Sequence, residues 1–128
     1  MSYYFAKTLE TGFEDAVERT TAALQERGFG VLTEIDVQAT LKKKLDVDMD
    51  RYLILGACNP PFAHKAVQAE PHIGLMLPCN VMVRDVGEGT VEVSTVDPVA
   101  SMGAIENPAL ADVAGEVRRL LEETIESL

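Results

Sequence analysis

The chain of 128 residues contains no tryptophan, and aromatic residues make up only 5% of it. No apolar run approaches the roughly 20 residues that span a bilayer, and residues 1–7 lack the basic and apolar segments of a signal peptide. We therefore expect a cytoplasmic protein with no membrane partner, whose two cysteines are reduced rather than bridged. Its core has to be built mainly from Leu, Val, Ile, Ala and Met.

Positive charge is also scarce. The chain has 11 Lys and Arg residues against 21 Asp and Glu residues, which gives a formal net charge of −10. The basic cluster from Lys42 to Lys44 is largely cancelled by Asp46, Asp48 and Asp50. Binding to nucleic acid requires a local excess of Lys and Arg, so we expect no nucleic-acid partner. The charge of this acidic protein instead favours solubility.

The length fits one domain over residues 1–128. Apolar or alternating runs between turn residues predict strands, and apolar residues at helical spacing predict helices. The predicted strands cover residues 3–8, 29–35, 52–57, 75–86 and 90–96. The predicted helices lie within residues 11–28, 36–45, 60–70 and 108–125.

Several residues mark where these elements begin and end. Asn59-Pro60 and Asn107-Pro108 each read as a helix cap followed by a proline in the first turn. Thr11 and Glu14 match the capping box of a helix start. Pro78 predicts a bend or bulge within the strand at residues 75–86, because proline cannot donate to a ladder.

This order predicts an α+β fold with a single antiparallel sheet. The two long helices lie on one face, and short helices are inserted between the strands. The predicted strands at residues 52–57 and 75–86 are nonetheless apolar on both faces. Either the inserted helices or a second copy of the protein must cover the second face. We favour a homodimer, because large apolar patches rarely stay exposed.

The two cysteines lie in similar settings, Gly56-Ala57-Cys58-Asn59-Pro60 and Leu77-Pro78-Cys79-Asn80. Cys58 precedes a predicted helix start, where free amides and the helix dipole favour a reactive thiolate. Cys79 lies in a predicted strand, where a thiol commonly packs as a small apolar group. Asn59 and Asn80 either tie strand ends together or line a polar pocket with the thiols.

The sequence leaves the distance between the two thiols open. If their strands were antiparallel neighbours, several residues would separate Cys58 from Cys79, too far for a disulfide. A crossover between parallel strands, or a dimer axis, would bring the thiols together.

A soft metal such as copper(I) or zinc is an alternative ligand. Sulfur and imidazole donors are supplied by Cys58, Cys79, His64, His72, Met76, Met82 and Met102. No two of them have a recognised ligand spacing such as Cys-x-x-Cys. We therefore predict no metal site, with Cys58, Cys79 and His72 as weak candidates.

The stretch from Gly28 to Asn80 resembles the family called domain of unknown function 302. The resemblance rests on Gly28-Phe29, Glu34-Ile35-Asp36, the lysine-rich Leu41 to Leu45, Tyr52 to Pro60, Glu70-Pro71, Gly74 and Leu77-Pro78-Cys79-Asn80, and continues through Val93 to Pro98. It implies a β-α-β4-α fold similar to half of the TATA-binding protein, and it implies dimers. It implies no activity, cofactor or catalytic residue.

Three functions follow from these observations. We favour a dimeric binding module with a small pocket near Cys58, Asn59, Cys79 and Asn80 for a thiol-reactive, sulfur-containing or soft-metal ligand. The alternatives are an enzyme of redox or sulfur chemistry with Cys58 as the thiolate, and a structural or regulatory protein without a small-molecule site. No cofactor is predicted.

Overall fold

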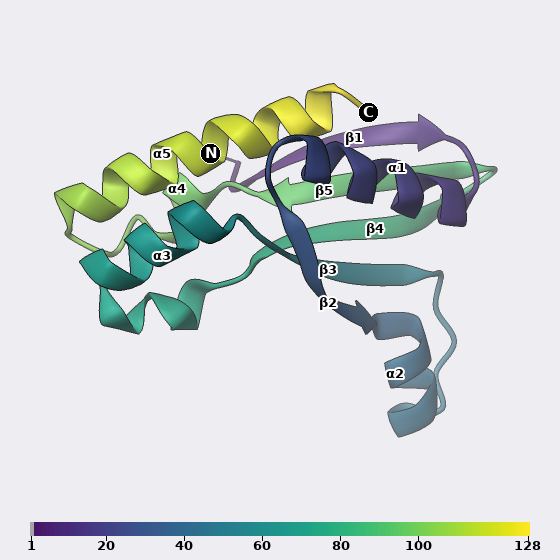
Figure 1. Ribbon diagram of the computed structural model, residues 1–128. Coiled ribbons are helices and arrows are strands. Elements are labelled where there is room, and N and C mark those ends of the chain that lie inside the picture. The colour runs from purple at the N-terminus through teal and green to yellow at the C-terminus, as the bar shows by residue number, and fades with distance from the viewer. Residues whose placement is uncertain (1) are drawn as a thin grey trace.

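Five strands pair into one antiparallel sheet with the order β1-β5-β4-β3-β2 (Figure 1). In this computed structural model, which describes residues 2–128, the strands are β1 (Tyr4–Glu10), β2 (Gly30–Asp36), β3 (Tyr52–Cys58), β4 (Cys79–Gly87) and β5 (Thr90–Val96). The helices are α1 (Phe13–Glu26), α2 (Val37–Leu45), α3 (Pro60–Ala69), the 3-10 helix η1 (Pro71–Met76), α4 (Pro98–Ser101) and α5 (Pro108–Glu126). The predicted α+β class with a single antiparallel sheet is confirmed, while the likeness to the TATA-binding protein stays a prediction.

The long helices α1 and α5 cover one face of the sheet, and α3 packs beside α5 (Figure 1). The layer between them is mainly aliphatic, with Phe13 and Phe29 also buried in it. Its most deeply buried large side chains include Leu24, Leu55, Val81, Val83, Val93 and Leu121. Each fully buried aliphatic side chain contributes about 1.5–3 kcal/mol relative to an exposed one.

The other face of the sheet is much less covered. The inserted helix α2 packs mainly against β2 and β3 and projects away from the layer of long helices (Figure 1). No residue of α2 is buried. Along β5, Val91, Val93 and Thr95 face the core, so Glu92, Ser94 and Val96 point to this open face.

Both asparagine–proline steps begin helices, and each asparagine also reaches the end of another helix. Asn107 Oδ1 accepts from two backbone amides in the first turn of α5, at 3.1 and 3.4 Å, while its Nδ2 donates to the carbonyl of Ala69 at 2.8 Å. Asn59 makes no side-chain cap to its own helix. Its Nδ2 donates instead to the carbonyl of Arg27 at 3.2 Å. The ends of α3 and α1 thus gain partners for carbonyls that a helix leaves free.

Two local predictions are wrong, and both concern where an element begins. Residues 71–76 form η1, so β4 begins at Cys79, and Pro78 stands before the ladder rather than bending a strand. The capping box is absent, because Gly12 is the cap residue and makes no side-chain cap. Thr11 Oγ1 donates instead to the Asp15 carboxylate at 2.6 Å.

Gly56 provides a test of the packing at the centre of the sheet. A Cβ there would lie 2.3 Å from Thr33 Oγ1 and 2.8 Å from Pro78 Cγ. We expect Gly56→Ala to lower the free energy of unfolding by about 1–3 kcal/mol, because a proline ring yields little. Gly115→Ala is the control, since no neighbour lies within 4 Å of that position in α5. It should raise the free energy by about 0.5–1 kcal/mol.

Urea unfolding of the two variants measures both changes. A Gly56→Ala variant as stable as the unmodified protein would contradict the close approach of Pro78.

Candidate functional site

The register of β3 and β4 brings the two cysteines close together. Ala57 pairs with Cys79 across an antiparallel ladder, and Cys58 follows Ala57. The expectation that antiparallel pairing would leave several residues between the thiols is therefore wrong, because β4 starts at Cys79 rather than at residue 75. Successive side chains of a strand point to opposite faces. Cys79 therefore faces the helices, whereas Cys58 points the other way, and both thiols are free.

Cys79 is a poor nucleophile in this setting. Its side chain is buried, with 7% of its surface exposed. Burial raises the pKa of the Cys79 thiol to about 11, and a negative charge on Cys58 adds to this rise. Near neutral pH, Cys79 is therefore a neutral thiol that packs as an apolar side chain.

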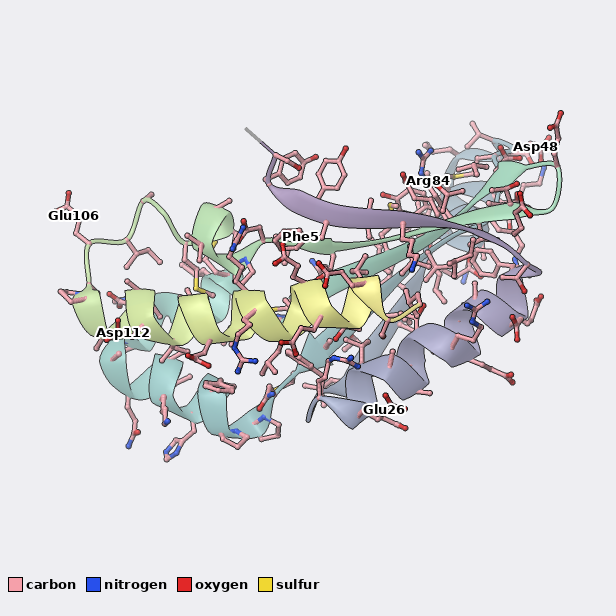
Figure 2. All side chains as sticks on the ribbon, turned by 90° about the horizontal axis from the view of Figure 1, so that it is seen from above. Phe5, Glu26, Asp48, Arg84, Glu106 and Asp112 are labelled. Atoms are coloured by element: carbon pink, nitrogen blue, oxygen red, sulfur yellow. The ribbon has the colours of Figure 1, made fainter. Side chains whose placement is uncertain are left out.

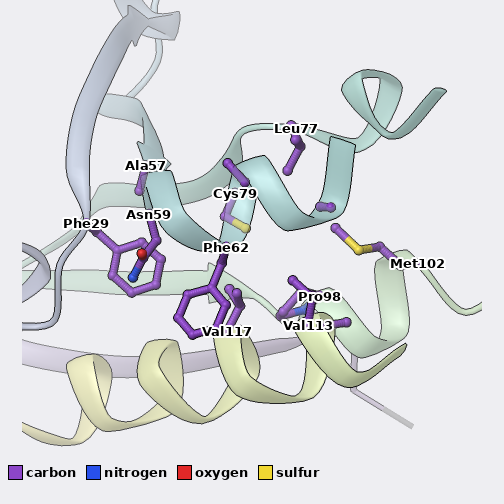
Figure 3. Close-up of a pocket in the computed structure, with 13 residues that line it drawn as sticks. Phe29, Ala57, Asn59, Phe62, Leu77, Cys79, Pro98, Met102, Val113 and Val117 are labelled. Atoms are coloured by element: carbon purple, nitrogen blue, oxygen red, sulfur yellow. The ribbon is translucent and has the colours of Figure 1, made fainter. Parts of the chain in front are cut away.

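A small cavity of about 30 Å³ lies between α3, α5 and the sheet, with Cys79 and Asn59 in its wall (Figure 3). The rest of the wall is apolar and includes Phe29, Ala57, Phe62, Leu77, Met102 and Val117. This space suits about one or two water molecules. An organic ligand does not fit unless the surrounding side chains move.

A larger hollow of about 540 Å³ opens on the less covered face of the sheet. Two rows of cross-strand neighbours lie on this face. The first row consists of Thr8, Glu92, Arg84 and Tyr52, and the second of Ala6, Ser94, Met82 and Ile54. Of these two rows, Glu92, Arg84, Tyr52, Ser94 and Met82 line the hollow, and the small side chain of Ser94 leaves room at its centre. Tyr4 and Tyr52 line the hollow from the flanking strands β1 and β3.

One ion pair crosses the hollow. Arg84 Nε donates to Glu92 Oε1 at 2.7 Å, and Figure 2 shows Arg84 on the side of the sheet away from the long helices. The hydrogen bond to Glu92 and the negative charge of that carboxylate raise the pKa of Arg84 above its usual value. The hollow therefore combines one fixed cation, one carboxylate and phenol groups.

Comparison with known proteins identifies the family. The family model described as Domain of unknown function DUF302 matches residues 5–128. The chain belongs to the DUF302 family. The crystal structure of an uncharacterized conserved DUF302 protein from Bacillus stearothermophilus is similar to this DUF302 chain, with a TM-score of 0.90 and 27% identity over 98% of each chain. No match is found among the curated proteins.

The four residues predicted to share a pocket are divided by the sheet of this DUF302 protein. Cys79 and Asn59 line the inner cavity, Asn80 lines the open hollow, and Cys58 lines neither of the two. The amide of Asn59 is already bonded to the end of α1. Sequence reasoning did not select Tyr4, Tyr52, Arg84 or Glu92. The sequence contains one indication of this face. Along residues 90–96, Glu92 alternates with Val91 and Val93 and so lies on the opposite side of the strand.

Among the metal candidates, Cys58 and Cys79 lie near each other but point to opposite faces of the sheet. Residues 2–128 contain no group of three His, Cys, Asp or Glu side chains placed to hold an ion. His72 is exposed, and its Nδ1 lies 3.4 Å from Glu70 Oε1. His64 is also exposed. In the same described part of the DUF302 chain, no helix is long and apolar enough to cross a membrane.

The two thiols should differ sharply in labelling by iodoacetamide. In the Cys58→Ser variant, Cys79 is the remaining thiol, and burial, the larger cause of its raised pKa, still keeps its thiolate fraction at pH 8 far below that of an exposed thiol. We expect slow labelling in the folded state and a rate that increases about tenfold per pH unit until that pKa is reached. Mass spectrometry measures both rates.

The Cys79→Ser variant is the matched comparison, because it keeps only the partly exposed Cys58. It should be labelled faster than Cys58→Ser, and both variants should react alike in urea. Equal labelling of the two folded variants would contradict the burial of Cys79.

Proposed function

We propose that this protein is a homodimeric binding module that holds a small molecule in the hollow on the open face of its sheet. The supporting observation is the hollow itself. Its 540 Å³ lies within the range of about 300–1,000 Å³ found for small-molecule sites. The inner cavity beside Cys79 is more than ten times smaller. Four residues are predicted to form the site, namely Cys58, Asn59, Cys79 and Asn80. Of these, we therefore expect Asn80 to contact the ligand.

The lining suits an amphipathic ligand. All three tyrosines of the chain, Tyr3, Tyr4 and Tyr52, lie along this hollow. Tyrosine combines a large apolar ring with a polar end, which is why it is common where ligands and partners bind. Asn80 is exposed here and makes no side-chain hydrogen bond to any residue from 2 to 128. Its amide is free to donate to a ligand and to accept from one.

A fragment titration followed by ¹H–¹⁵N NMR tests this site. The fragments are small aromatic and aliphatic molecules with negative, neutral or positive groups. We expect at least one class to cause saturable shifts in β1, β4 and β5. Ser94→Leu should weaken this binding, because Ser94 forms part of the floor and is only 9% exposed. Val67→Phe on the exposed surface of α3 is the control and should bind like the unmodified protein.

Shifts confined to the helices, or no saturable shift with any fragment, would rule out the hollow as the binding site. Equal binding by Ser94→Leu and the unmodified protein would do the same.

A second candidate is thiol chemistry at Cys58, and one observation favours it. Gly30 pairs with Cys58 across β2 and β3 and brings no side chain over the thiol. Cys58 itself is partly exposed. The labelling rate of Cys79→Ser decides this candidate. A rate no faster than that of a model thiol between about pH 6 and 9 would leave no activated thiolate at this position.

The segment formed by β2 and α2 supports the homodimer. Three large apolar side chains remain exposed along it, namely Leu32 (67%), Ile35 (50%) and Leu45 (66%), and Val47 (42%) follows just after α2. β2 is also an edge strand of the sheet, with backbone groups free to pair. We propose that a second copy of the chain covers this segment and thereby removes both the apolar surface and the free edge from water.

Light scattering at micromolar concentration should give twice the chain mass of 13.9 kDa. The double variant Ile35→Lys/Leu45→Lys should give the mass of a single chain, because it places two charges on the proposed interface. Leu75→Lys is the control, since Leu75 is 84% exposed but lies outside β2 and α2. A single-chain mass for the unmodified protein would reject the homodimer without affecting the hollow.

A further inference from the structure

We infer that the ligand of the open hollow is a small aromatic carboxylate whose carboxylate is held by Arg84. This inference rests on the proposed function, because it names the ligand class of the same site. It depends on three features of the hollow. These are the free end of the Arg84 guanidinium, the unequal exposure of the Arg84–Glu92 pair, and the position of Tyr52 beside Arg84.

Glu92 occupies only part of the Arg84 guanidinium. The bond to Glu92 uses Nε, while the two terminal amino groups of Arg84 make no hydrogen bond to any residue from 2 to 128. A guanidinium carries five N–H donors in a planar fork and binds carboxylates through two parallel bonds. Glu92 therefore fixes the orientation of Arg84 through one edge, and the terminal edge remains available for a second carboxylate.

The unequal exposure of Arg84 and Glu92 favours a negatively charged ligand. The Arg84 side chain is 45% exposed, whereas the Glu92 side chain is 23% exposed. A ligand that enters the hollow therefore meets the guanidinium more readily than the carboxylate. Tyr52 and Tyr4 also line the hollow, and their hydroxyls add O–H donors for an anion. A cationic ligand would instead have to displace Arg84 from Glu92.

The apolar part of the ligand follows from the neighbours of Arg84. Tyr52 pairs directly with Arg84 across β3 and β4, and Met82 lies two residues along β4 on the same face. Tyr52 supplies an aromatic surface, and the sulfur of Met82 interacts favourably with aromatic rings. Tyr4 is three strands away from Tyr52 and four residues further along the ladder, so about 14 Å across the sheet and about 13 Å along it separate the two positions. That gap is too wide to clamp one ring between two tyrosines, so the ring lies on the floor with its carboxylate toward Arg84.

Three probes of the same shape test the charge. Benzoate, benzamide and benzamidine each carry one ring and differ in having a negative, neutral or positive group. We expect benzoate to shift the amides of β4 and β5 and to bind at least about fivefold more tightly than benzamide, as a charge-assisted bond at a partly exposed site requires. Acetate, which has the carboxylate but no ring, should bind more weakly than benzoate.

Two variants should change benzoate affinity in opposite directions. Arg84→Gln should weaken it about tenfold, because the charged fork is lost. Glu92→Gln should strengthen it, because a carboxylate that repels the ligand and shares the guanidinium is removed. A purely structural role of the ion pair would make both variants weaker. Arg119→Gln, in an exposed ion pair on α5, is the control and should leave the affinity unchanged.

The outcomes separate this inference from the proposed function. If benzamide or benzamidine binds in the hollow as tightly as benzoate, the carboxylate class is wrong and the binding site stands. If Glu92→Gln weakens benzoate binding, Arg84 does not hold the carboxylate. If no fragment of any charge binds in the hollow, both proposals fail. Should Arg84→Gln not fold, Arg84→Lys replaces it, and unchanged affinity in that variant would overturn the role of the planar fork.

Discussion

The ladder between β3 and β4 joins the two parts of this sheet. Among residues 2–128, β2 pairs only with β3, and β1 reaches the rest of the sheet through β5 and β4. The inward side chains of this ladder, Leu55, Val81 and Val83, have at most 1% of their surface exposed. Hydrophobic burial thus stabilises the same contact that the backbone hydrogen bonds define. A slip of one residue would turn either Leu55 or both Val81 and Val83 outward, and would place a side chain against Pro78 in place of Gly56.

The order of the elements could be predicted because each carries its own local signal. Asn107 and Pro108 mark the start of α5, and the side chain of Asn107 caps that helix as expected. The errors arose where a local signal met a tertiary contact. Thr11 has the sequence of a capping residue but donates to Asp15 instead. The apolar residues 75–77 before Pro78 are typical of a strand, but Leu75 and Met76 belong to η1, which is held in place by the completely buried Ile73.

The open hollow was beyond a sequence-based prediction for a different reason. Tyr52, Arg84 and Glu92 are cross-strand neighbours, but they come from three strands, and Tyr4 comes from a fourth. Alternation along a strand predicts which side chains share a face. It does not predict that β1 lies beside β5, at the opposite end of the sheet from β2. The distance between the two cysteines could not be predicted for the same reason. It depends on the register that places Ala57 opposite Cys79.

The position of the tyrosines also determines what optical spectroscopy detects in this protein. With no tryptophan, near-ultraviolet absorption and intrinsic emission come almost entirely from Tyr3, Tyr4 and Tyr52, all on one face of the sheet. The aliphatic core contributes almost nothing to these signals, while far-ultraviolet circular dichroism follows the helices on the opposite face. A melting curve recorded through the tyrosines therefore describes the open face, and one recorded through the helices describes the core. If the two midpoints differed, the open face would loosen separately from the core, and a single unfolding temperature would not describe the molecule.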